Sequence, residues 1–122
     1  MRNQILVYLR ERKVKNEKYL SFILSEDMYD IEFKLCSIDG FDFMVSHFFD
    51  STNQAGYGLI STNRMLKTDS GRQLAIGLIE GDDVICMDLE TGIISLWMIQ
   101  TGGGEYLQVA QNFEEFMKMC VE

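Results

Sequence analysis

Proline is absent from this sequence of 122 residues, which has one histidine and one tryptophan. Without proline, its turns must be marked by glycine and by clusters of Asn and Asp. No apolar run reaches the roughly 18 residues that a membrane-spanning helix needs. The apolar run from Ile5 to Leu9 is shorter than the core of a signal peptide. We therefore expect a chain that stays in the compartment where it is made, the cytoplasm.

Cysteine is also scarce. Cys36, Cys86 and Cys120 are odd in number and far apart, whereas a secreted domain more often has an even set that forms a disulfide framework. We expect reduced thiols that serve as small buried apolar groups. No Cys-x-x-Cys or His-x-x-x-His spacing occurs, so the sequence predicts no zinc site. We expect no other metal and no cofactor.

Residues that could catalyse a reaction lack suitable neighbours in the sequence. His47 lies in an apolar segment, and Cys36 and Cys86 lie in strand-like apolar segments where burial makes a thiol less reactive. The glycines at 102–104 precede an acid, not the lysine of a phosphate-binding loop. Residues 80–83 lack the spacing of a calcium loop. The sequence therefore predicts a protein that is not an enzyme. A hydrolase that uses scattered carboxylates remains an alternative.

Charge is divided unevenly along the chain, whose formal net charge is −8. Residues 1–18 hold six bases and two acids, whereas residues 19–122 hold five bases and seventeen acids. An acidic body of this kind repels nucleic acid and anionic membranes and favours a basic partner. Acidity also keeps a protein soluble, so charge alone does not identify a partner.

The pattern of apolar residues predicts helices at both ends and strands between them. Residues 3–14 fit a helix or a short strand, and we favour the helix; Asn16 can cap a second helix that reaches Leu24. A brief helix is expected over 64–67, opened by Ser61-Thr62-Asn63. A closing helix is expected after Asn112, with Glu115 in position for a capping box. The expected strands are 29–36, 41–49, 73–79, 84–89, 93–99 and 106–110.

Turn signals separate these strands at short intervals. Asp39-Gly40 favours a tight hairpin between the first two strands. Residues 84–89 are almost continuously apolar, which predicts a central strand covered on both faces. The order predicts an α+β fold in a single domain over 1–122, with a helical N-terminal part at 1–28, a mostly antiparallel twisted sheet and a closing C-terminal helix.

The second half of the chain resembles a known family. Its motifs follow one another in the order Gly58-Leu59-Ile60-Ser61-Thr62, Ala75-Ile76-Gly77, Glu80-Gly81-Asp82, Val84 to Leu89, Gly92, Trp97, and Val109 to Phe116. This order resembles the SUKH superfamily, which includes Smi/Knr-type regulators of fungal cell-wall synthesis and many bacterial immunity proteins. The first 30 residues depart from the family pattern, since proline is absent and Ser25-Glu26-Asp27 stands where the family has glycines.

The resemblance implies a protein-binding antidote that neutralises a bacterial toxin, often a nuclease. A regulatory interaction module without a toxin partner is the alternative. No catalytic residues come with this resemblance. We expect the partner to be a basic toxin domain, with no role for nucleic acid or membrane. The candidate partner-binding residues are acids expected on turns and on the wet faces of strands: Asp42, Asp50, Glu80, Asp82, Asp83 and Glu105.

Overall fold

The computed structural model describes residues 2–24, 35–38, 41–50, 57–68, 71–100 and 103–121. Its helices are α1 (Arg2–Glu11), α2 (Glu17–Leu24), α3 (Leu59–Leu66) and α4 (Phe113–Val121). Its strands are β1 (Leu35–Ile38), β2 (Phe41–Phe48), β3 (Gln73–Ile79), β4 (Val84–Asp88), β5 (Ile94–Met98) and β6 (Glu105–Ala110). The expected α+β fold, with N-terminal helices, an antiparallel sheet and a closing helix, is confirmed.

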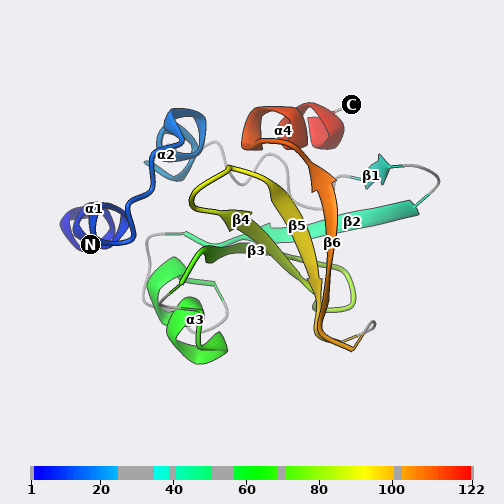
Figure 1. Cartoon of the computed structure of the whole chain (residues 1–122), viewed down its shortest axis with the longest axis horizontal. Coiled ribbons are helices and arrows are strands. Elements are labelled where there is room, and N and C mark those ends of the chain that lie inside the picture. The colour runs from blue at the N-terminus through cyan, green and yellow to red at the C-terminus, as the bar shows by residue number, and fades with distance from the viewer. Residues whose placement is uncertain are drawn as a thin grey trace.

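The six strands pair in the order of the chain, and every pair is antiparallel. The sheet twists strongly between β2 and β6 (Figure 1). Ile38 pairs with Phe41, which confirms the hairpin expected between the first two strands. All five residues of β4 are buried, as its continuous apolar sequence predicts for a central strand. Residues 29–34 of the expected first strand lie outside the described residues.

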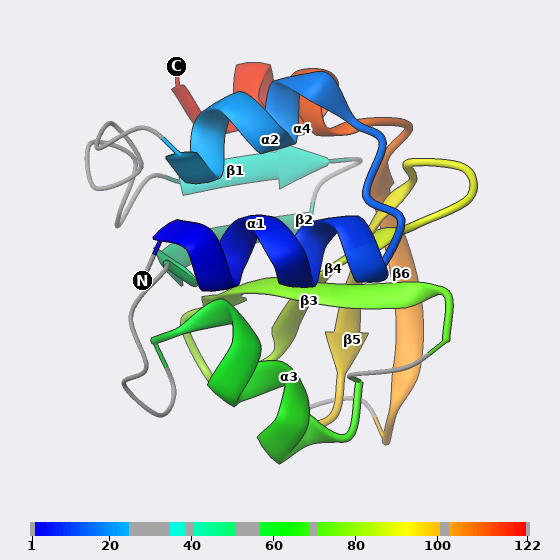
Figure 2. The ribbon, with the colours of Figure 1, turned by 90° about the vertical axis from the view of Figure 1, so that its left-hand side faces the viewer.

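Helices α2 and α4 lie together on one side of the sheet, and α1 lies between α2 and α3 (Figures 1 and 2). Aromatic rings from α2, β2 and α4 form the centre of this packing. Tyr19 meets Phe113 edge to face at a centroid distance of 5.2 Å, and Phe22 meets Phe48 in the same way at 5.0 Å. Burial of such large rings is a major source of stability.

Local sequence signals explain where two of the helices begin. The Asn16 side-chain oxygen accepts the Tyr19 amide at 3.0 Å, and the Asn112 oxygen accepts the Glu115 amide at 2.8 Å. Both asparagines therefore satisfy an amide that the first helical turn leaves without a partner. The expected helix over 3–14 is a helix, but it ends at Glu11, and the positive φ of Lys13 lies just beyond that end.

Helix α3 begins at Leu59, five residues before the expected start at Arg64. Ser61-Thr62-Asn63 was expected to open the helix, but these residues lie inside it, and Gly58 occupies the N-cap position without a side-chain cap. Asn63 does not cap because its side chain is bound elsewhere. It donates to the Leu59 and Ala75 carbonyl oxygens at 2.8 and 2.9 Å and accepts the Ala75 amide at 2.9 Å. The side chain thus fastens α3 to β3.

Candidate functional site: an acidic end of the sheet

Four of the six candidate acids gather at one end of the sheet and are exposed. Asp42 lies near the start of β2, Glu80 and Asp82 lie in the β3–β4 turn, and Glu105 begins β6. The antiparallel register brings these positions to the same end, because Val45 pairs with Ile79, Val84 with Trp97, and Met98 with Glu105. Figure 1 shows the start of β2 and the β3–β4 and β5–β6 turns on the side away from α1.

Asp83 is the clear correction among the predicted residues. It was expected to be exposed on a turn, but it is only 1% exposed. Its carboxylate accepts a hydrogen bond from the Gln100 backbone amide at 2.8 Å, and its carbonyl oxygen accepts one from the Ile79 backbone amide at 3.0 Å. Asp83 therefore joins the β3–β4 turn to the end of β5, and a partner protein could not reach it without disrupting both.

Asp50 lies away from the acidic end. It follows β2 at the opposite end of that strand, and it is half-buried. Its backbone amide donates to the Tyr57 carbonyl oxygen at 2.7 Å, and its carbonyl oxygen accepts the Leu59 backbone amide at 2.8 Å. Asp50 thus helps to position the start of α3. The acidic end of the sheet therefore consists of Asp42, Glu80, Asp82 and Glu105.

No base interrupts the sequence around three of these acids. Residues 73–117 contain eight acids and no lysine, arginine or histidine. This run supplies β3, β4, β5, β6 and the start of α4. In the described part of the chain, Glu80, Asp82 and Glu105 form no ion pair. These three acids therefore present negative charge that no ion pair neutralises among the residues that the structure describes. The base-free run was visible in the sequence, but only the register shows which of its acids lie at the same end of the sheet.

An aromatic pair adjoins the acidic end. Trp97 on β5 and Tyr106 on β6 are register partners, and their rings stack with a centroid distance of 5.7 Å and an interplanar angle of 2°. Tyr106 is 48% exposed, and the next residue, Leu107, is 39% exposed. Trp and Tyr are, with Arg, the residues enriched at the energetic centres of protein interfaces. The sequence alone favours neither a core nor a binding role for Trp97, because its partner ring cannot be identified without the register.

The residues considered for catalysis have structural surroundings. The His47 ring stacks on the Tyr57 ring with a centroid distance of 4.6 Å. The distance between His47 Nδ1 and the Ser46 hydroxyl oxygen is 3.2 Å. Burial raises the pKa of the Cys86 thiol to about 12, so this thiol is protonated at neutral pH. The side chains of Cys36 and Cys120 lie outside the described residues. Among the side chains that are described, no three His, Cys, Asp or Glu gather closely enough to hold a metal ion.

A groove of about 650 Å³ lies between α1 and α3. Its lining includes Val7 and Ile60, with Glu11 and Arg64 as the charged members. One acid and one base of this kind do not form a nucleophile–base pair, and the groove contains no member of the acidic end. We therefore treat it as a gap between two helices, not as the functional site.

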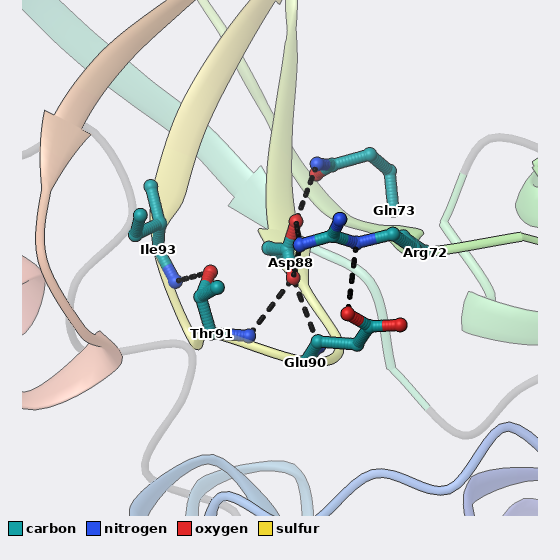
Figure 3. A network of polar contacts seen from close by, with 6 residues as sticks. All are labelled: Arg72, Gln73, Asp88, Glu90, Thr91 and Ile93. Carbon is teal, nitrogen blue, oxygen red and sulfur yellow. Dashed lines mark hydrogen bonds and ion pairs between the residues drawn. The ribbon is translucent and has the colours of Figure 1, made fainter.

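Asp88 is the centre of a polar network at the other end of the sheet (Figure 3). Its Oδ1 accepts the Glu90 and Thr91 amides at 2.8 and 2.9 Å, and Arg72 lies 3.1 Å from Oδ2. Burial raises the pKa of this carboxyl, but the amides of Thr91 and Glu90 and the nearby Arg72 outweigh burial, and the pKa is lowered from 3.8. The network closes the β4–β5 turn and ties it to β3.

We expect Asp88→Asn to cost about 1–2 kcal/mol of unfolding free energy at pH 7, because hydrogen bonds to a charged acceptor are stronger than those to an amide oxygen. The folded-state pKa is lowered, so the carboxylate stabilises the fold above its unfolded pKa of about 3.9, and this contribution is lost as the pH falls through the folded value. Urea unfolding at several pH values should show that the difference in unfolding free energy between wild type and variant becomes smaller below about pH 4.

The matched control is Glu114→Gln, because Glu114 is exposed and its contact with Lys118 is long, at 3.9 Å. This variant should change stability by less than about 0.5 kcal/mol at any pH. A gap for Asp88→Asn that stays constant from pH 7 to pH 3 would show that the charge of Asp88 does not stabilise the turn.

Comparisons with protein-family models, with curated proteins and with solved structures gave no match to this chain. Within the described ranges, no helix combines the length and the apolar character that crossing a membrane requires.

Proposed function

We propose that this chain is a cytoplasmic protein-binding antidote of the SUKH type, which neutralises a basic bacterial toxin domain by forming a complex with it. The observation that carries the proposal is the acidic end beside the stacked Trp97–Tyr106 pair. Negative charge attracts a basic partner and speeds its association, while aromatic rings such as the exposed Tyr106 and the partly buried Trp97 supply contact area and affinity. The order of motifs from Gly58 to Phe116 adds the resemblance to immunity proteins.

The distribution of charge supports an oriented encounter. The bases of residues 1–18 belong to α1, α2 and the segment between them, which lie away from the turns of the acidic end (Figure 1). A basic partner is attracted to one end of the molecule and repelled by the other. Binding in place of catalysis is further supported by the protonated Cys86 thiol and by the packing of His47 against Tyr57.

The proposal is tested with the product of the gene next to the one that encodes this chain. We expect that product to arrest growth when expressed alone, and co-expression of this chain to restore growth. The purified proteins should form a one-to-one complex whose affinity falls with salt, because exposed charges are screened. A neighbouring gene product that is harmless, and that does not bind, would overturn the antidote proposal and favour a regulatory module.

A charge-reversal variant tests the surface. Replacing Glu80, Asp82 and Glu105 by lysine should lower the association rate with the toxin by about tenfold or more at low salt. The control reverses three exposed acids outside the acidic end, Glu11, Glu17 and Glu114, and changes net charge by the same amount. Equal effects of the two variants on the rate would show that the acidic end is not the contact surface.

A further inference from the structure

Strand β6 is the edge of the sheet, with β5 as its only strand partner in the described part of the chain. Its first four residues, 105–108, are all exposed, whereas Val109 and Ala110 are buried. Figure 1 shows β6 at the front of the molecule with no helix over its first part, while α4 contacts both β1 and the end of β6 that leads into this helix. An uncovered edge presents backbone amides and carbonyls in a row, which can pair with another strand.

The first part of this edge, residues 105–108, has no lysine, proline or bulge to protect it against such pairing. Natural edge strands carry lysine, proline or bulges that prevent a second strand from adding. The β6 sequence, EYLQVA, has neither lysine nor proline. Its one irregularity is at Val109, where the register passes from Gln108 opposite Ser95 to Ala110 opposite Ile94. The regular edge is therefore 105–108, which spans roughly 13 Å.

The side chains along this edge define the chemistry of a suitable strand. Glu105 is the one charged residue of β6, and an opposite charge on an adjoining strand would stabilise the pairing. Tyr106 extends the row Val84–Trp97–Tyr106, so a cation beside Tyr106 would lie against an aromatic surface. Leu107 offers an apolar contact on the other face.

Charge decides between a basic partner and a second copy of this chain. If a second copy of this chain added its own strand, the base-free runs over 73–117 of the two copies would lie against each other. Each copy also has a net charge of −8. Such an arrangement places like charges together, which is unfavourable. A strand rich in lysine or arginine instead brings opposite charge to Glu105 and to the base-free run beside it.

We infer that residues 105–108 of β6 form a β-addition site for an extended basic segment of the partner protein, held by main-chain hydrogen bonds and by Glu105, Tyr106 and Leu107. The inference rests on the proposed function for the identity of the partner, but the site itself is defined by the edge and its side chains. Main-chain pairing supplies affinity in such sites, and alternate side chains supply specificity.

The probes are short synthetic peptides that are added to the isotope-labelled whole chain and followed by NMR. One peptide alternates lysine and valine, and a second replaces the central valine by proline, which keeps the charge and removes a main-chain donor. We expect the first peptide to shift the NMR signals of the backbone amides of 105–108 and to slow the hydrogen exchange of these amides. The second peptide should bind at least about tenfold more weakly. A peptide that alternates glutamate and valine should not bind.

A pair of variants completes the test. Leu107→Lys should weaken binding of the lysine–valine peptide at least about tenfold. Leu6→Lys on α1, where the leucine is 40% exposed, should leave the affinity unchanged. Equal binding of the two basic peptides would overturn β-addition, because it would show attraction by charge alone, and it would leave the antidote proposal intact. Self-association of the chain that is abolished by Leu107→Lys would overturn the basic partner in favour of a second copy.

Discussion

Replacing Asn63 by alanine is expected to lower the free energy of unfolding by about 3–5 kcal/mol, because each buried polar group left without a partner costs roughly 1–3 kcal/mol. Asn63 is 0% exposed, and its amide uses its full hydrogen-bonding capacity. It donates to Leu59 and Ala75 and accepts from the Ala75 amide and, at 2.8 Å, from the Thr68 hydroxyl. The alanine variant would leave the Ala75 amide and carbonyl buried without their partner. Denaturant unfolding followed by circular dichroism measures the loss.

Two further variants identify the cause. Asn63→Asp keeps the shape and both acceptor contacts, but it loses two donors and places a carboxylate beside two carbonyl oxygens. It should be at least as damaging at pH 7 and should partly recover at low pH, where the protonated acid regains a donor. Met65→Gln on the same helix is the control, since Met65 is 59% exposed. A loss below about 1 kcal/mol for Asn63→Ala would show that this side chain does not fasten α3 to β3.

Gly77→Ala should destabilise the chain by about 2–3 kcal/mol, although alanine is normally preferred to glycine in a strand. An added Cβ would lie 2.8 Å from the His47 carbonyl oxygen and 3.3 Å from the Phe48 Cα. Both are backbone atoms of β2, so relief requires the separation of two paired strands. Gly77→Val should cost more than Gly77→Ala. Thermal unfolding monitored by calorimetry gives both values.

Two comparisons separate crowding from backbone conformation. Gly71 has a φ of +95° and open space around its Cβ position, so Gly71→Ala carries only the cost of a left-handed conformation, about 1 kcal/mol. In the double variant with Ile85→Val, the Ile85 Cδ1 contact at 3.2 Å is removed but the contact with His47 remains. We expect little rescue. Full rescue would show that the Ile85 side chain, and not the β2 backbone, excludes a larger residue.

Features set by neighbouring residues could be predicted from the sequence. The caps at Asn16 and Asn112 act within three residues, and β4 shows its central position through its own apolar side chains. The hairpins follow from glycine and Asp signals that lie between adjacent strands. Such elements need no knowledge of the rest of the fold, which explains why the α+β class and the antiparallel sheet agree with expectation.

Features that depend on distant partners could not be predicted. Asp83 resembles a solvated turn residue until the Gln100 amide is brought to it across the sheet. Asn63 resembles a helix cap until β3 supplies a better partner at Ala75. The placement of Asp42, Glu80 and Glu105 at the same end of the sheet likewise requires the register of several strands. In each case the sequence contains the residue but not the atom that it contacts.

The strictly sequential strand order has a consequence for how the chain folds. Every strand from β2 to β6 pairs with the strand that precedes it, so most of the sheet forms through contacts of low sequence separation. Low contact order favours rapid folding, because little loop-closure entropy is lost before pairing begins. The packing of α2 on α4, where Tyr19 meets Phe113, joins residues from opposite ends of the sequence. We therefore expect the hairpins to form early and the docking of these two helices to complete the fold.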